Sequence, residues 1–186
     1  MPNALTVARV AAVPLLGAAF YSTALVRSRL PAILFAFCAL TDWLDGFLAR
    51  KWAVDSDFGA FLDPVADKVL VCTSLCLLSG SLGGVVALPT AIIVCREVSV
   101  SALREWMGAR GQRAAVAVGW WGKVKTAAQM VALQLLLLAH GVTSPAAQAL
   151  RTTGLALLYA ATCLTCTSAA PYFQAAAPVL LGRSEK

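Results

Sequence analysis

Long apolar stretches alternate with short polar or turn-forming segments along the whole chain. A helix that crosses the hydrocarbon core of a bilayer needs roughly 20 apolar residues. The pattern predicts six such helices, over residues 4–26, about 31–52, 58–79, 85–106, a fifth that closes at His140, and about 146–169. Residues 171–186, which follow the last of these stretches, predict a frayed or surface-lying tail.

The composition supports a membrane protein. Of the 186 residues, 60% are hydrophobic and 13% are charged, whereas a soluble domain carries about 25% charged residues. A disordered chain is excluded by this composition, and a water-soluble globule is disfavoured. We therefore expect an all-α, polytopic integral-membrane protein with about six transmembrane helices, in which residues 1–186 form one domain.

Basic residues are distributed unevenly between the two predicted membrane faces. Arg27, Arg29 and Arg151 are the basic residues predicted for one face, and the other Lys and Arg residues of the predicted connections and C-terminal tail fall on the face that carries the termini. The positive-inside rule then places the termini in the cytoplasm or its organellar equivalent. The net charge of +6 is explained by these loops and by binding of lipid head groups or phosphate substrates, and no nucleic-acid partner is expected.

Acidic residues cluster where the second and third predicted helices meet. Six of the nine Asp and Glu residues fall between positions 42 and 67. Asp42 and Asp45 lie three residues apart, and Asp63 and Asp67 lie four apart, so each pair shares a helical face if Pro64 does not break the helix. Two antiparallel helices joined by a short loop would bring these four carboxylates together just inside the bilayer.

Such a cluster requires positive charge. A carboxylate at bilayer depth costs a few kcal/mol, and four of them repel one another. Mg²⁺ or Mn²⁺ would solve both problems because hard cations prefer carboxylate oxygens. The alternative is ion pairing with Lys68, Arg50 and Lys51. Gly46 and Ala49 on the same face favour a ligand, since small residues let a bulky group approach the backbone.

These residues carry a family resemblance. The pattern Asp42-x2-Asp45-Gly46-x2-Ala49-Arg50-x8-Gly59-x3-Asp63-x3-Asp67 matches every fixed position of the signature of the CDP-alcohol phosphatidyltransferase family. The six-helix pattern and the N-terminal Pro2-Asn3-Ala4-Leu5-Thr6 are also similar to that family. The resemblance implies a homodimeric membrane enzyme that transfers a phosphatidyl group from CDP-diacylglycerol to an alcohol.

The resemblance also implies roles for individual residues. Asp42, Asp45, Asp63 and Asp67 would hold two divalent ions, Mg²⁺ or Mn²⁺, that bridge the pyrophosphate, and Asp67 would also act as the general base. The residues that would bind the CDP-linked lipid are Asn3, Thr6, Gly46, Ala49, Arg50, Ser56 and Gly59. Asn3 and Thr6 fit equally well as the polar start of a helix.

The acceptor implied by the resemblance is glycerol 3-phosphate, which would give phosphatidylglycerophosphate and CMP in the synthesis of phosphatidylglycerol and cardiolipin. The stretches that support this choice are TDWLDGFLARKW, FLDPVADKVL, REVSVSALRE and GKVKTAAQM. The acceptor's phosphate needs a cationic pocket, for which the candidates are Arg96, Arg104, Lys123 and Lys125, with Glu97 and Glu105 placed to orient the arginines.

Alternatives remain at this stage. The same chemistry can use inositol phosphate, phosphatidylglycerol or serine as the acceptor. A membrane cation transporter would instead need carboxylates distributed through the bilayer depth, and these lie toward one end. A bacterial plasma membrane fits the sequence, as does a plastid or mitochondrial inner membrane.

Overall fold

The computed structural model describes residues 2–52, 57–112 and 120–180, and the side chains within these ranges except those of residues 2–5, 43–52, 57–61, 63 and 121. Every regular element in these ranges is an α-helix. The helices are α1 (Pro2–Tyr21), α2 (Thr23–Arg27), α3 (Leu30–Trp52), α4 (Asp57–Leu82), α5 (Gly84–Gly108), α6 (Trp120–Ala139) and α7 (Pro145–Leu180).

The six helices predicted from the sequence correspond to α1, α3, α4, α5, α6 and α7. The first differs from its prediction, because the span expected over 4–26 is interrupted at Ser22, whose extended backbone (φ −85°, ψ 114°) separates α1 from the short α2. Arg29 then takes a positive φ of 58° and reverses the chain into α3. Pro64 lies inside α4 without ending it, so the helix is continuous across the predicted acidic stripe.

The prediction of a frayed tail is wrong for residues 171–180. Helix α7 runs on to Leu180 and contains both Pro171 and Pro178. Its last turns pack against α5 in a buried cluster of Val100, Leu103, Met107, Tyr172 and Ala176. Proline is tolerated in membrane helices where neighbouring helices support the freed backbone groups, and packing against α5 supplies that support here.

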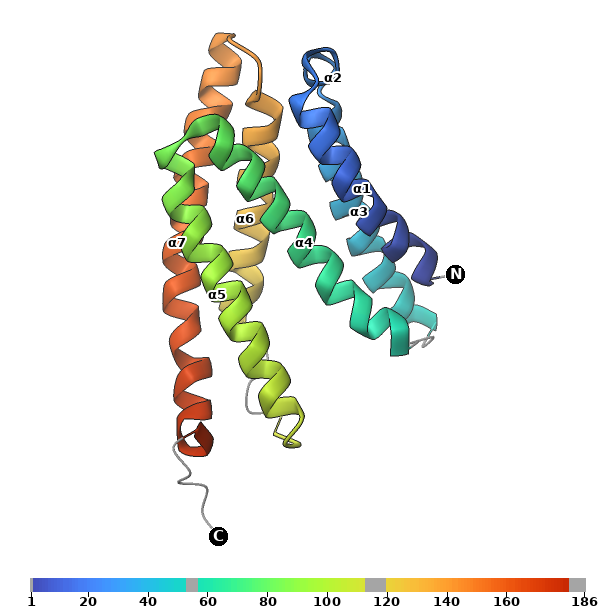
Figure 1. Ribbon diagram of the computed structural model, residues 1–186, viewed down its shortest axis with the longest axis vertical. Coiled ribbons are helices and arrows are strands. Elements are labelled where there is room, and N and C mark those ends of the chain that lie inside the picture. Colours follow the sequence, from blue (N-terminus) through green and yellow to red (C-terminus); the bar gives the residue numbers. More distant parts are fainter. Residues whose placement is uncertain (1, 53–56, 113–119, 181–186) are drawn as a thin grey trace.

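The ends of the helices lie in two groups, at opposite ends of the molecule (Figure 1). The connections α1–α2–α3, α4–α5 and α6–α7 lie at one end of the molecule, which we call the turn end. The N-terminus, the end of α3, the start of α4 and the ends of α5 and α7 lie toward the other end, which we call the terminal end. This alternation agrees with the predicted arrangement, in which Arg27, Arg29 and Arg151 lie at the end opposite the termini.

Helix α1 packs against both α3 and α4, while α5 contacts α4 and α7. One face of α1 is buried along its length, and its core residues include Val13, Leu16 and Phe20. Toward the terminal end the same face continues at the helical spacing of three to four residues with Thr6 and Arg9, which are both buried. The core-facing stripe of α1 therefore carries a charged side chain to the terminal end.

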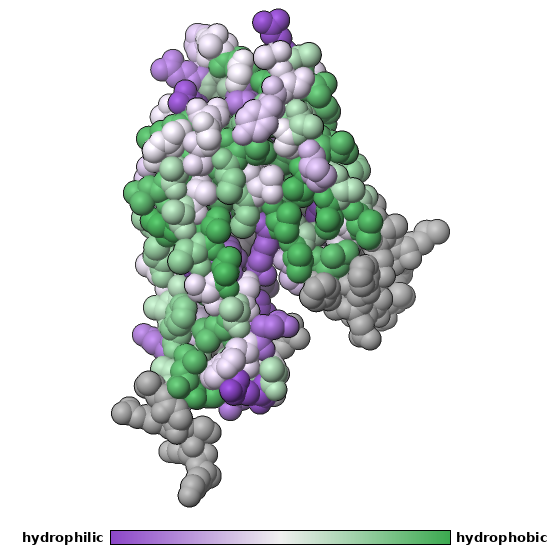
Figure 2. All heavy atoms as spheres, in the orientation of Figure 1, coloured by the Kyte–Doolittle hydropathy of each residue, from purple (hydrophilic) through white to green (hydrophobic). Residues whose placement is uncertain are grey.

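The surface of the bundle suits a lipid environment. Segments Pro64–Leu82, Gly84–Gly108 and Pro145–Leu180 are long and apolar enough to cross a membrane, and Thr6–Tyr21 and Leu30–Asp42 are shorter apolar helices. Hydrophobic atoms cover much of the outer sides in Figure 2. The protein is thus an all-α membrane protein.

Candidate active site

Arg9 joins the two signature aspartates whose side chains the structure describes. Its Nη1 atom lies 3.0 Å from Oδ1 of Asp42 on α3 and 3.1 Å from Oδ1 of Asp67 on α4. The Arg9 side chain is fully buried, whereas those of Asp42 and Asp67 are 39% and 46% exposed. The guanidinium thus lies on the protein side of the two carboxylates, which remain open toward the other side.

The helical register accounts for this convergence. Helix α3 is unbroken through Asp42 and Asp45, and α4 is unbroken through Asp63 and Asp67. Residues three or four apart on a helix share a face, so the unbroken helices are compatible with the predicted grouping of the four aspartates. The side chains of Asp45 and Asp63 lie outside the described residues.

The way in which the helices meet differs from the expected direct pairing. Among the described residues α3 and α4 touch little, and α1 packs against each of them. Arg9 was not among the candidate residues from the sequence, although a charged residue inside an apolar helix is a signal in itself, because it is costly unless paired. Its partners could not be identified from α1 alone.

The donor set suits a divalent cation. Two carboxylates from different helices converge on one positive charge, and hard oxygen donors of this kind are what Mg²⁺ and Mn²⁺ prefer. Among the side chains described, no group of three or more His, Cys, Asp and Glu residues could hold a metal ion. The four-aspartate centre therefore stays a prediction.

The predicted CDP-lipid residues are described only in part. Thr6 is buried one helical turn from Arg9 on the same face of α1. The side chains or surroundings of the others lie outside the described residues; they are Asn3, Gly46, Ala49, Arg50, Ser56 and Gly59.

A second polar site lies between α4, α5, α6 and α7. It is a cavity of about 170 Å³. Its lining contains Lys68, Arg96, Arg104 and Lys125, together with Glu97, Val100, Ser101, Gly122, Thr126 and Tyr172. Figure 2 shows hydrophilic atoms inside a hollow on the terminal half of the molecule, in contrast to the apolar outer sides.

Glu97 organises part of this cavity. Its Oε1 accepts a hydrogen bond from Nη1 of Arg96 at 2.9 Å and a short one from the ammonium group of Lys125. Arg96 also donates to Ser168 at 3.5 Å and lies 5.7 Å from the centre of the Tyr172 ring, a cation–π contact. The arginine is therefore held in place by three residues before any ligand binds.

Donors remain in the cavity for an anion. The Nε atoms of Arg96 and Arg104 are buried and make no hydrogen bond to any of the residues that the structure describes. A buried N–H group without a partner is costly, so these atoms fit a site completed by a ligand. Four basic side chains and one acidic one line the cavity, which makes that ligand an anion.

The remaining predicted residues lie elsewhere. Lys123 is exposed and is not in the lining of this cavity. Glu105 is exposed and takes part in none of the ion pairs of the described residues. Lys68 and Tyr172 were not predicted as acceptor-site residues, and Tyr172 comes from the helical segment that was expected to fray.

The two sites are neighbours on α4, because Lys68 of the cavity directly follows Asp67. Carboxylates that suit divalent cations thus adjoin a pocket that suits an anion. A model of the CDP-alcohol phosphatidyltransferase family matches residues 1–167. The chain belongs to this family.

Similar proteins cover nearly the whole chain. The chain is 46% identical to a CDP-diacylglycerol–glycerol-3-phosphate 3-phosphatidyltransferase of Pectobacterium atrosepticum, with 97% of each chain covered. Proteins of the same name from Salmonella choleraesuis and Escherichia coli are 45% and 44% identical, again over 97% of each chain. This CDP-alcohol phosphatidyltransferase is therefore a membrane transferase.

Proposed function

We propose that this chain transfers the phosphatidyl group of CDP-diacylglycerol to glycerol 3-phosphate, giving phosphatidylglycerophosphate and CMP. The observation that carries the proposal is the convergence of Asp42 and Asp67, from the two halves of the family signature, beside a cavity lined by basic residues. The names of the relatives, at about 45% identity over 97% of the chain, support the same reaction.

Asp42, Asp45, Asp63 and Asp67 would hold two divalent ions, which neutralise the pyrophosphate and stabilise the departing CMP when bound. Arg9 contributes by contacting Asp42 and Asp67 from their buried side. This contact limits the rotation of both carboxylates and leaves their other sides exposed. We infer that Arg9 is a positioning residue for the metal site.

Asp67 is the proposed base. Its carboxylate takes the proton of the acceptor hydroxyl as the hydroxyl oxygen attacks the phosphorus atom, and the bond from phosphorus to the CMP oxygen breaks. Because Lys68 is the next residue along α4 and lines the acceptor cavity, an acceptor phosphate held there keeps its hydroxyl end near Asp67.

The charge of the cavity favours an acceptor that carries phosphate. Charge-assisted hydrogen bonds to a phosphate dianion can come from Arg96, Arg104 and Lys125. Serine carries no phosphate and cannot use these donors in this way. Glycerol 3-phosphate meets this condition.

An acceptor assay tests the proposal. Purified protein would be given CDP-diacylglycerol and Mg²⁺ with glycerol 3-phosphate, inositol phosphate, serine or phosphatidylglycerol, and the lipid product identified by mass spectrometry. We expect phosphatidylglycerophosphate and an equal amount of CMP from glycerol 3-phosphate only. Product from another acceptor, with none from glycerol 3-phosphate, would refute the assignment, and Asp67→Asn controls for contaminating activity.

We further propose that residues 1–186 act as one multi-pass domain in a bacterial plasma membrane, as a homodimer. The bacterial origin of the relatives supports the membrane, and the family resemblance supports the dimer. A plastid or mitochondrial inner membrane is the alternative. Cross-linking in native membranes tests the dimer, since a chain that stays monomeric at every cross-linker concentration contradicts it.

A further inference from the structure

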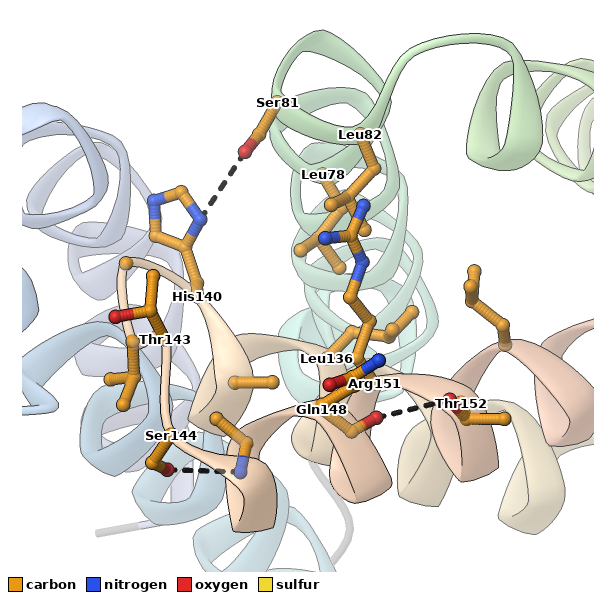
Figure 3. Close-up of a pocket in the computed structure, with 15 residues that line it drawn as sticks. Leu78, Ser81, Leu82, Leu136, His140, Thr143, Ser144, Gln148, Arg151 and Thr152 are labelled. Atoms are coloured by element: carbon orange, nitrogen blue, oxygen red, sulfur yellow. Dashed lines mark hydrogen bonds between the residues drawn. The ribbon is translucent and has the colours of Figure 1, made fainter.

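Two adjoining cavities occupy the turn end, remote from the aspartates. The larger, about 730 Å³, lies between α4, α6, α7 and the α6–α7 connection (Figure 3). The smaller, about 490 Å³, lies between α1, α2, α4 and the same connection. Ser81, His140 and Gly141 line both, so the two cavities adjoin across a shared wall, and we call the pair the turn-end site.

The charge of the turn-end site has one sign. Arg151 lines the larger cavity and Arg27 the smaller, and no Asp or Glu of the described segments lines either. Neither arginine takes part in the ion pairs of the described residues. Figure 3 shows the Arg151 side chain extending from α7 toward Leu82 and Leu78 on α4, across the larger cavity. The site thus offers guanidinium groups to an anion that the protein itself does not provide.

A rigid frame surrounds the site. Nε2 of His140 donates a hydrogen bond to the carbonyl of Phe20 at 3.4 Å, so its Nδ1 accepts one from the hydroxyl of Ser81 at 3.3 Å. The imidazole also stacks on the Phe20 ring, with 3.9 Å between ring centres. His140 therefore ties the end of α6 to α1 and α4.

Gly141 brings α2 close to this frame. Its φ is +69°, and a Cβ atom there would lie 2.2 Å from Cγ1 of Val26. Only glycine allows both the left-handed backbone and the close approach. Since Arg27 follows Val26, this contact fixes the helix that carries Arg27 beside the shared wall of the two cavities.

The larger cavity has both polar and apolar lining residues. Its polar lining includes Ser81, Thr143, Ser144, Gln148 and Thr152, and its apolar lining includes Leu78, Leu82, Leu136 and Leu155. Ser144 caps α7, because its hydroxyl accepts a hydrogen bond from the backbone N–H of Ala147 at 3.1 Å. The start of this 36-residue helix adds partial positive charge to the part of the lining that Ser144 and Ala147 form.

We propose that the turn-end site binds the head-group phosphate of an anionic phospholipid from the leaflet opposite the reaction centre. Arg151 and Arg27 bind the phosphate, the hydroxyl groups complete its hydrogen bonds, and the leucines contact the start of the acyl chains. A free phosphate would use the arginines alike but would leave the leucines uncovered, so the lipid is the favoured source.

Lipid titration of the purified protein in neutral detergent tests the proposal. Thermal unfolding and native mass spectrometry would follow phosphatidylglycerol, phosphatidylcholine and inorganic phosphate in separate titrations. The variants are Arg27→Gln/Arg151→Gln and, as a matched control, Arg29→Gln, which lies on the same face but lines neither cavity. The readout is the difference in lipid binding between the wild type and the double variant. Any lipid that binds at the active site contributes equally to both proteins and cancels in this difference.

We expect phosphatidylglycerol to raise the unfolding temperature of the wild type and the control more than phosphatidylcholine does. In the double variant the apparent affinity falls by about tenfold or more, as expected when charged hydrogen bonds are lost, while basal transferase activity and lipid-free stability stay unchanged. Equal affinity of the wild type and the double variant for phosphatidylglycerol would overturn the proposal. An equal, arginine-dependent shift with inorganic phosphate at the same concentration would overturn the choice of a lipid.

Discussion

Nη1 of Arg9 lies 3.1 Å from Oδ1 of Asp67, although 58 residues separate the two in the chain. The arginine belongs to α1, which carries none of the signature aspartates, and its side chain is fully buried. Asp67 is the proposed base of the reaction, and Arg9 also contacts Asp42. The first helix is thus part of the framework that sets the positions of the reactive carboxylates.

Replacing Arg9 should weaken the protein most when divalent ions are absent. Arg9→Gln removes the charged hydrogen bond to Asp67 and the ion pair with Asp42, and should cost about 1.5–3 kcal/mol of unfolding free energy. Mg²⁺ should recover part of this loss, because it supplies positive charge that the guanidinium no longer supplies. Unfolding of wild type and variant in EDTA and in saturating Mg²⁺ measures both values.

The exposed Arg29 provides the control for this experiment, since Arg29→Gln removes a charge without touching an aspartate. A positioning role for Arg9 also predicts a lower affinity of Arg9→Gln for Mg²⁺, with partial recovery in Arg9→Lys. If the affinity for Mg²⁺ is unchanged and the stability loss is the same with and without the ion, Arg9 serves packing alone.

Arg104 should govern the acceptor. Arg104→Gln removes one donor group from the anion cavity, so the KM for glycerol 3-phosphate should rise by about tenfold to a hundredfold while the KM for CDP-diacylglycerol stays near that of the wild type. Arg110→Gln is the matched control, because Arg110 is exposed and stacks on Trp106, 3.7 Å from the ring centre. Equal effects of the two substitutions on acceptor KM would contradict the assigned cavity.

The ring of Tyr172 should matter more than its hydroxyl. Tyr172→Phe keeps the aromatic face beside Arg96 and should leave acceptor KM almost unchanged. Tyr172→Leu removes the cation–π contact, worth roughly 0.5–2 kcal/mol, and should raise that KM several-fold. Steady-state kinetics of the two variants decide the point, and an equally large rise of the acceptor KM in Tyr172→Phe and Tyr172→Leu would show that the site uses the hydroxyl rather than the ring.

His140 should make the turn end less stable in acid. Burial lowers the pKa of His140 below its ordinary 6.5, although the hydrogen bond to the Phe20 carbonyl opposes the shift. The folded state then binds fewer protons than the unfolded state. The contribution of neutral His140 to the free energy of unfolding is therefore complete above pH 6.5 and is lost as the pH falls below it. Unfolding temperatures measured across this range should fall more steeply for wild type than for His140→Gln; parallel curves would contradict the assignment.

The sequence could predict the halves of the active site but not the link between them. Helical spacing places Asp42 with Asp45 and Asp63 with Asp67 whatever the tertiary structure is, because i, i+3 and i, i+4 neighbours share a face. Arg9 meets them only because α1 packs against both α3 and α4, and such packing depends on the shapes of all three helices. The charge of Arg9 in an apolar helix was visible, but its partners were not.

The end of α7 shows a different limit. Pro171 and Pro178 lie within the segment that was expected to fray, and proline inside a helix removes a backbone donor and clashes with the preceding turn. Packing of Tyr172 and Ala176 against α5 outweighs that local preference. As a result Tyr172 reaches the anion cavity, which the sequence alone could not have indicated.

Binding of Mn²⁺ to the purified protein tests the central claim most directly. Electron paramagnetic resonance titration in the presence of CDP-diacylglycerol counts the bound ions and compares wild type with Asp42→Asn and Asp67→Asn. We expect two ions per wild-type chain, a loss of at least one in each variant, and transfer activity that falls in step with the bound metal. Unchanged Mn²⁺ binding by both variants, or full activity after chelation of all divalent ions, would contradict the account.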